Sequence, residues 1–563
     1  MMVIFNRFLR EMVLMGMMLF VAGRPLLAND AVRPEIRAIW ADAFHDGFKT
    51  PDQVDQLVDD CLKANLNTII VQVRRRGDAF YNKSIEPRTE DPGLAPGFDA
   101  LQYLIEKAHA KRIEVHAWLN TLVAWNAATP PKAANHVWNL HGPNSAGAAN
   151  WIAYFRKYNS INRKWSGKLY SSFFLDPGHP TVVDYTAAVY LNVVKNYDVD
   201  GIHLDYSRYD GLGWGYNATS VARYNNRYGK SGLPLPDDPL WMQWRREQTA
   251  NLVRKIYLKA IALKPSVKVS AAVVTWGDGP VTDADWEQSR GYTVAGQDWR
   301  GWLEEGILDL AIPMNYFSDW NKTRQSWYNK WIEWEKDHQY GRQIVIGPGL
   351  YLQYIENSLD QIRRAQAPSA QGNYAAGVSL YAYGWNNLYS NDDYKENLNP
   401  KGLPRQPHQY LPESNNWLFS LLAKAGSYYD PVLKRQIATE PVFSTPAAIP
   451  DMPWKSQPVS GYLMGTLTGS TGQNYDGVKI IVKSADLTMQ REVATDGGGW
   501  YGLTELRPGR YRVWADHPDF VSTCLEVTVQ AGQVSEANFL AAEENPRFDA
   551  ELPSNPGKKE GNR

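Results

Sequence analysis

The stretch that decides the fold is Tyr197–Tyr209, which reads YDVDGIHLDYSRY. Near its centre the apolar residues Ile202 and Leu204 alternate with ionisable ones, His203 and Asp205. Because successive side chains of a strand point to opposite faces, the ionisable pair shares one face and the apolar pair the other. A short buried strand whose polar face ends in an acid is typical of catalytic sites in barrels and open α/β sheets.

Outward from this strand, strand-like and helix-like segments alternate between Glu35 and about Asn387. The predicted strands are 36–41, 67–73, 113–119, 201–205, 267–274, 308–314, 343–348 and 376–382. Helical patterns separate them, among them Pro51–Asn65, Asp99–Lys111, Thr181–Tyr197 and Leu240–Leu263. This alternation predicts a parallel α/β sheet, and eight strands favour a closed (β/α)8 TIM barrel over a doubly wound sheet.

The length of 563 residues predicts more than one domain. We expect the barrel over 35–427, a Pro-rich linker over 428–458 and a small antiparallel β-sandwich over 459–542, followed by a polar, disordered tail, 543–563. The predicted sandwich strands are 461–469, 477–483, 491–495, 509–515 and 525–530, which alternate in polarity and are separated by turn signals.

The N-terminus has the pattern of a secretory signal peptide. Arg7 and Arg10 precede an apolar run, 12–22, and small residues follow as far as Ala28. We therefore expect residues 1–28 to be a signal peptide, and the mature chain to be secreted or periplasmic without a transmembrane segment. The apolar run is short for a membrane span, and an uncleaved anchor is the alternative.

Composition narrows the function classes. The net charge of -1 gives no general attraction to nucleic acid, and 22 Trp, 32 Tyr and 16 Phe favour a carbohydrate partner, although large cores also use aromatic residues. Cys61 and Cys524 fall in different predicted domains, so we expect two free thiols and no metal cluster. No cofactor is expected, and the chain is expected to be a monomer.

Three successive strands carry polar side chains on one face. These are Gln72 and Arg74 on the second strand, His116, Trp118 and Asn120 on the third, and His203 and Asp205 on the fourth. If the apolar faces meet the outer helices, the polar faces converge inside the barrel towards the strand C-termini, where barrel enzymes hold their chemistry. A lone inward histidine is more often a satisfied core residue, whereas three converging faces indicate a site.

Asp205 is the first candidate for a catalytic carboxylate, and the alternative is a structural acid paired with Arg208 or Arg74. A barrel rim with acidic, amide and aromatic side chains is typical of glycoside hydrolysis. In that reaction one carboxyl group protonates the leaving oxygen, and a second carboxylate either attacks the sugar or activates water. The second carboxylate is left open among Asp278, Asp319, Glu287 and Asp176.

Further rim residues are candidates for substrate binding. They are Arg74, Asp78, His116, Asn120, Asp176, His203, Trp276, Asn315, Tyr316, Tyr351, Tyr381 and Tyr383. Asp78 and Asp176 could equally be turn residues. The long loop after the third strand, about 121–176, contains Trp125, Trp138, Trp151 and Trp165, which either wall a sugar cleft or pack the loop onto the barrel.

The motifs between about Glu35 and Asn387 resemble the bacterial family-ten glycosyl-hydrolase-like domain. They are Glu35–Trp40, Val71–Arg74 with Gly77–Tyr81, His116–Asn120, Leu175–Gly178, Asp200–Tyr206, Gln297–Trp299 and Asp309–Tyr316, in the family's order. The resemblance implies a secreted (β/α)8 glycosidase-like enzyme and, in some members, cleavage of peptidoglycan glycan strands stripped of their peptides. The family's fourth strand often ends in paired acids, whereas here Tyr206 follows Asp205.

The stretch 461–541, with Ala494–Tyr501 and Leu506–Tyr511, resembles a carboxypeptidase-regulatory-like β-sandwich, a module that is usually non-catalytic. Together the two resemblances favour a secreted glycoside hydrolase acting on a polysaccharide. The alternative is an inactive barrel that binds carbohydrate or acts as a cell-envelope scaffold. A polysaccharide deacetylase would need a set of metal ligands, which we do not find in the sequence.

Overall fold

The computed structural model describes residues 33–167, 173–387, 412–430, 435–469, 475–520 and 523–541. The predicted signal peptide, 1–28, and the predicted disordered tail, 543–563, lie outside these residues.

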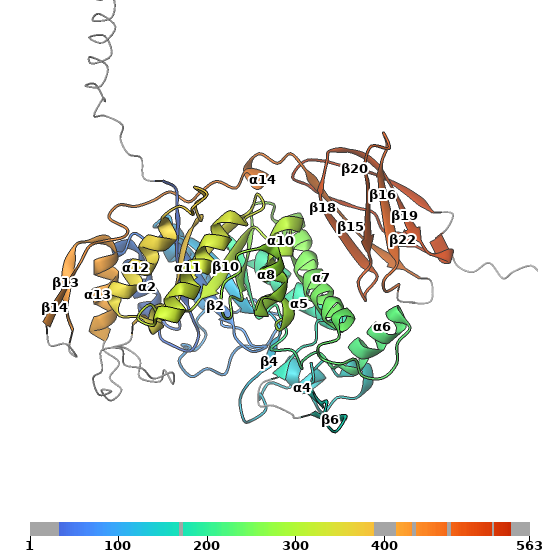
Figure 1. The fold of residues 1–563 in the computed structure, drawn as a ribbon, viewed down its shortest axis with the longest axis horizontal. Helices are drawn as coiled ribbons and strands as arrows, with labels where there is room; N and C mark the ends of the chain where they lie inside the picture. The colour runs from blue at the N-terminus through green and yellow to red at the C-terminus, as the bar shows by residue number, and fades with distance from the viewer. Residues whose placement is uncertain are drawn as a thin grey trace, which may run out of the picture.

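Eight parallel strands close into a barrel, each hydrogen-bonded to its neighbours in the circular order β1, β2, β3, β8, β9, β10, β11, β12 (Figure 1). The strands are β1 (Ile36–Ala41), β2 (Thr68–Arg74), β3 (Glu114–Asn120), β8 (Gly201–Asp205), β9 (Lys268–Val273), β10 (Leu310–Asn315), β11 (Gln343–Pro348) and β12 (Gly377–Tyr381). The predicted TIM barrel is confirmed, and each of the eight predicted strands overlaps an observed one.

Helices connect the strands. They are α2 (Pro51–Lys63), α3 (Ala100–His109), α4 (Val137–His141), α5 (Pro180–Asn196), α6 (Ala218–Tyr228), α7 (Pro239–Leu263), α8 (Asp283–Gln288), α9 (Arg290–Thr293), α10 (Trp299–Glu305), α11 (Lys322–Asp337), α12 (Ile355–Gln366) and α13 (Pro412–Ala423). Short elements in the connections are η1 (Gly147–Ala149), η2 (Leu350–Leu352), β4 (Val123–Trp125), β5 (Arg156–Asn159), β6 (Lys164–Gly167) and β7 (Phe173–Phe174). Local signals start several helices: Asp238 accepts from two backbone amides of α7, and Pro239 begins that helix.

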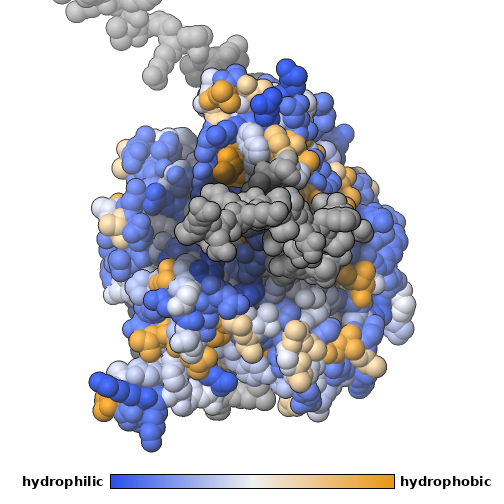
Figure 2. Space-filling view, turned by 90° about the vertical axis from the view of Figure 1, so that its right-hand side faces the viewer, coloured by the Kyte–Doolittle hydropathy of each residue, from blue (hydrophilic) through white to orange (hydrophobic). Residues whose placement is uncertain are grey.

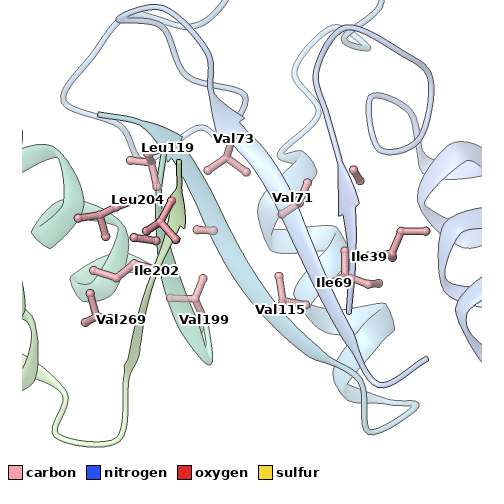
Figure 3. Close-up of a cluster of buried hydrophobic side chains, with 14 of the residues drawn as sticks. Ile39, Ile69, Val71, Val73, Val115, Leu119, Val199, Ile202, Leu204 and Val269 are labelled. Atoms are coloured by element: carbon pink, nitrogen blue, oxygen red, sulfur yellow. The ribbon is translucent and has the colours of Figure 1, made fainter. Parts of the chain in front are cut away.

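The strands separate two apolar layers. Ile202 and Leu204 belong to a large buried cluster with Val71 and Val115, which packs with helical residues (Figure 3). The opposite side chains fill the barrel interior, where Ile36, Ala38, Trp40, Ile70, Trp118, Leu310, Ile312 and Val345 form a second cluster. The period of two therefore sorts the side chains as expected, and the polar faces of β3 and β8 point inward.

The segment predicted as a linker, 428–458, carries structure and packs on the barrel. It includes most of the hairpin β13 (Gly426–Asp430) and β14 (Arg435–Thr439), and the short helix α14 (Pro453–Ser456). Met452 joins the interior cluster, and Trp454 Nε1 donates to Asp309 Oδ1 over 2.6 Å at the start of β10. The segment therefore packs against the N-terminal ends of the barrel strands, where Glu35 N–H also donates to the carbonyl of Ala448.

The C-terminal module is a β-sandwich of two sheets. One contains β15 (Gly461–Thr468), β18 (Trp500–Leu506), β21 (Val534–Glu536) and β22 (Phe539–Leu540), and the other contains β16 (Lys479–Ser484), β17 (Gln490–Ala494), β19 (Gly509–Asp516) and β20 (Cys524–Val529), with η3 (Pro518–Phe520) between strands. The predicted sandwich is confirmed, although β15 pairs with β21 and β22 in parallel. β18, β21 and β22 were absent from the sequence prediction.

The sandwich docks beside α7 (Figure 1). Lys255 Nζ lies 2.6 Å from Asp496 Oδ2, and Arg223 contacts both carboxylate oxygens of Asp476 at 2.6 and 2.8 Å. Figure 2 views the molecule from the sandwich side, where hydrophobic residues occur in small groups within a largely hydrophilic surface. In the part of the chain that the structure describes, no helix has the length and apolar character to cross a membrane.

Candidate active site

A cavity of about 210 Å³ opens at the C-terminal ends of the barrel strands. Its lining combines aromatic rings with a few polar groups: Trp40, Phe44, Gln72, Trp118, Asn120, Val123, Asn126, Phe174, His203, Asp205, Tyr206, Arg208, Ala272, Met314, Tyr316 and Tyr381. Of the predicted catalytic and binding residues, this cavity brings together Asn120, His203, Asp205, Tyr316 and Tyr381, and the predicted polar strand faces add Gln72 and Trp118. It lies at the end of the barrel where TIM-barrel enzymes place their active sites.

Asp205 is the last residue of β8 and is 7% exposed. Its Oδ1 accepts a 2.7 Å hydrogen bond from the backbone N–H of Tyr206, a residue with a left-handed φ of 53°, and Trp118 Nε1 lies 3.2 Å from Oδ2. Burial raises the pKa of Asp205 to about 6, against the opposing effects of the Arg208 charge and these two hydrogen bonds. A carboxyl with this pKa gains and loses a proton near neutral pH, as a general acid must.

His203 lies in the floor of the cavity with both ring nitrogens engaged. Trp40 Nε1 donates to His203 Nε2 over 3.2 Å, so Nδ1 carries the proton that it shares with Ser270 Oγ at 2.9 Å. Burial holds the pKa of His203 well below its ordinary value, so the ring is neutral. His203 therefore orients Trp40, and its ring nitrogens are not available to a substrate.

An amide network fixes the indole of Trp118. Its Nε1 lies 3.1 Å from Asn120 Oδ1 as well as 3.2 Å from Asp205, so the two acceptors share one proton. Asn120 Oδ1 also accepts from Gln72 Nε2 at 3.0 Å, and Asn120 Nδ2 donates to the carbonyl of Arg75 at 2.8 Å. Each member is held by its neighbours, which preorganises the wall around the acid.

Aromatic rings form the opposite wall. Tyr316 stacks on Tyr381 with ring centroids 5.0 Å apart and an interplanar angle of 24°, and Trp40 meets Tyr381 edge-on at 5.5 Å. The ring centroid of Tyr351 lies 5.8 Å from the ring centroids of both Tyr316 and Tyr381, and Tyr351 itself does not line the cavity. These rings offer rigid apolar area with polar edges, which suits the faces of a sugar.

Arg74, predicted to face the site, lies outside the cavity. The pairing of β2 with β3 shifts between Gln72 and Arg74, so that Arg74 aligns with Leu119, whose side chain belongs to the outer layer. There its Nε and Nη2 contact the two carboxylate oxygens of Glu86 at 2.7 and 2.8 Å, and Nη1 donates to the carbonyl of Asn120. The β-bulge reverses the period-two prediction at this one residue.

The proposed partner acids lie elsewhere. Asp278 is half-exposed and 2.6 Å from Lys330 Nζ, Asp319 is paired with Arg364, and Glu287 is exposed. Asp176 is fully buried and accepts from the backbone N–H groups of Gly178 and Asn217 at 2.9 and 3.1 Å, and burial raises its pKa to about 6. Among the described residues, Asp205 is the only carboxylate in the cavity lining.

Other predicted binding residues have structural partners. Asp78 accepts from Thr89 Oγ1 at 2.6 Å, and Tyr383 donates to Asp60 Oδ2 at 2.8 Å. His116 points into the barrel below the cavity, and its Nε2 lies 3.5 Å from Glu114 Oε2.

Two further predicted residues lie near the ends of the later strands. Asn315 Nδ2 donates to Oε2 of the buried Glu335 over 2.8 Å, and burial raises the pKa of Glu335 to about 8. The guanidinium groups of Arg208 and Arg290 lie over the ring of Trp276, 5.1 and 5.6 Å from its centroid.

The long loop after β3 contributes Val123, Asn126 and Phe174 to the cavity, and its four tryptophans pack elsewhere. Trp151, for example, stacks on His141 with ring centroids 3.5 Å apart. Sequence reasoning left Trp40, Phe44, Tyr206 and Arg208 out of the site. The period of β1 could have identified Trp40 as an inward residue, whereas Phe44 and Arg208 lie in loops that have no such period.

The barrel sequence matches a known family model. The Glycosyl hydrolase-like 10 model covers residues 35–364. The chain belongs to this family. Glycosyl hydrolase YngK of Bacillus subtilis is 27% identical over 61% of this chain, and Glycosyl hydrolase DigH of Escherichia coli is 28% identical over 47% of it. These alignments span 65% and 57% of the two relatives, respectively.

The family-ten barrel is followed by a second matched module, the Carboxypeptidase regulatory-like domain, over 463–541. Among solved structures, the glycoside hydrolase domain of PgaB from Bordetella bronchiseptica has 14% identity and a TM-score of 0.45, with 62% of this chain and 95% of that domain covered. Family membership therefore places the chain among the glycosyl-hydrolase-like proteins. The described residues contain no group of three or more His, Cys, Asp or Glu that could hold a metal ion.

Proposed function

We propose that this family-ten protein is a secreted or periplasmic glycoside hydrolase that cleaves a polysaccharide, with Asp205 as its general acid. The observation that carries the proposal is a buried carboxyl at the end of β8, with a pKa of about 6, in an aromatic-lined cavity. The glycosidic oxygen of a bound sugar would take the proton of Asp205 as the C1–O bond breaks. Burial favours the protonated form that this step needs.

The absence of a second carboxylate from the described cavity lining bears on the nucleophile. Where a glycosidase lacks a protein nucleophile, a 2-acetamido group of the substrate can form the bond to C1 through its carbonyl oxygen. Water then attacks C1, its proton returns to Asp205, and the acetamido group is restored. This favours an N-acetylated glycan, and we propose peptidoglycan strands stripped of their peptides as the substrate.

The lone carboxylate also favours a second candidate, a barrel that binds glycan without cleaving it. Only turnover separates the two candidates. The purified mature protein should be incubated with denuded peptidoglycan, intact peptidoglycan, chitin and a panel of unacetylated polysaccharides, and the products analysed by mass. The proposal predicts shorter saccharides from denuded peptidoglycan. Tight binding without products from any polymer would support the binding candidate instead.

A further inference from the structure

Arg208 lines the same cavity as Asp205, and among the described residues its guanidinium forms one long ion pair, with Asp210. The residue is 7% exposed. Its Nη1 lies 3.4 Å from the carbonyl of Tyr209 and 3.5 Å from Asp210 Oδ1, both longer than the roughly 2.7–2.9 Å of charge-assisted hydrogen bonds. Its Nε is buried without a hydrogen-bond partner among the described residues. A buried guanidinium left in this state is costly.

Arg74 provides a comparison within the same barrel, because its guanidinium has close hydrogen-bond partners. The two carboxylate oxygens of Glu86 meet its Nε and Nη2 at 2.7 and 2.8 Å, and backbone carbonyls accept from Nη1. Arg208 is buried nearly as deeply, but among the described residues no carboxylate meets it closely through both oxygens as Glu86 meets Arg74. A ligand carboxylate could supply the close bidentate contact that Asp210, at 3.5 Å, does not make.

The surroundings of Arg208 hold its guanidinium in place. The group lies over the ring of Tyr206, 4.4 Å from the centroid, and 5.1 Å from the centroid of Trp276. Contact with aromatic faces orients a guanidinium plane while its N–H edge stays free for a bidentate acceptor. Because Tyr206 directly follows Asp205, the same turn positions the acid and the cation.

We infer that Arg208 is an anion subsite that binds the carboxylate of an acidic sugar beside the bond cleaved at Asp205. The inference rests on the proposed function, since it assigns the sugar that this cavity takes. Two sources share this chemistry: the ether-linked lactyl carboxylate of denuded peptidoglycan and the ring carboxylate of a uronic acid. Binding also offsets the Arg208 charge, which otherwise lowers the pKa of Asp205, and so favours the protonated acid.

Binding should be measured by calorimetry in the Asp205→Asn background, so that the result does not depend on turnover. The probes are oligosaccharides from denuded peptidoglycan, hyaluronan oligosaccharides, and each of these with its carboxyl groups reduced to alcohols. One acidic probe should bind about 10- to 100-fold more tightly than its reduced form, as expected for a hydrogen-bonded charge pair. Which acidic probe shows the preference identifies the source of the carboxylate.

Arg208→Gln should abolish the preference for the acidic probe over its reduced form. Arg208→Lys should keep part of this preference, because a lysine retains the positive charge but lacks the paired N–H donors of a guanidinium. Arg290→Gln is the matched control, since Arg290 is exposed and lies over the same Trp276 ring at 5.6 Å. Circular dichroism confirms that each variant is folded. Equal binding of acidic and reduced probes, a preference that survives Arg208→Gln, or no binding of either acidic probe would overturn the inference. Failure of the wild-type protein to cleave any glycan would instead refute the proposed function.

Discussion

The indole nitrogen of Trp118 lies 3.2 Å from Oδ2 of Asp205 and donates a hydrogen bond to it. A donor to a carboxylate stabilises the charged form and so opposes the effect of burial on the pKa. The proton affinity of the proposed acid is thus set by residues of two neighbouring strands, β3 and β8, as well as by burial.

Trp118→Phe should therefore raise the pKa of Asp205 further. If Asp205 acts as a protonated acid, the basic limb of the kcat/KM profile moves to higher pH in this variant. Trp125→Phe is the matched control, because the indole of Trp125 donates to the carbonyl of Thr129 outside the cavity. A profile with the basic limb unmoved would show that Asp205 does not set it.

Asp205→Asn should stabilise the fold above pH 6. A carboxyl whose pKa rises on folding, from 3.8 to about 6, holds a proton that the unfolded chain has released. Stability is therefore lost as the pH rises from about 4 to 6, by about 3 kcal/mol at most. The free energy of unfolding of the variant should exceed that of the wild type at pH 8, and the gain should vanish at pH 3.5. An equal difference at both pH values would contradict the assignment.

Glu86→Gln should destabilise the barrel by about 3–5 kcal/mol, because it leaves the guanidinium of Arg74 buried without its carboxylate. Denaturation by urea measures the change. The exposed pair of Asp278 and Lys330 provides the comparison, since Asp278→Asn should cost less than about 1 kcal/mol. Similar losses in the two variants would mean that burial of the Arg74 pair has little energetic effect.

Lys255→Met should weaken the docking of the sandwich on α7. Lys255 is buried and lies between Asp184 and Asp496, at 2.7 and 2.6 Å, so its loss leaves Asp496 buried without a cation. Calorimetry should then resolve two unfolding transitions in place of one. Lys264→Met, which removes a pair with exposed Asp198, should leave the transition unchanged. A single transition in Lys255→Met would show that other contacts hold the two domains together.

The barrel could be predicted from the sequence because eight strand-like runs alternate with helical patterns between Glu35 and about Asn387. Ile202 and Leu204 went to the outer layer, and His203 and Asp205 went inward, as the alternation requires. Arg74 broke the pattern because a β-bulge precedes it, and nothing in the local sequence marks that bulge.

The rest of the site was harder to predict, because it depends on loops. Arg208 and Phe44 follow strand ends, where no periodicity fixes the direction of a side chain. The acids Asp278 and Asp319 have the residue type that a second catalytic group needs, but they form ion pairs with Lys330 and Arg364. Those partners lie 52 and 45 positions away, so the pairing depends on the tertiary fold.

The role of Asp205 as the proton donor is tested most directly by kcat/KM of Asp205→Asn on the glycan that the wild-type protein cleaves. Removing a general acid should lower kcat/KM by about 10²- to 10⁴-fold, while circular dichroism shows an intact fold. Asp278→Asn, measured alongside, should retain wild-type turnover because Asp278 lies outside the cavity. Undiminished cleavage by Asp205→Asn would contradict the account.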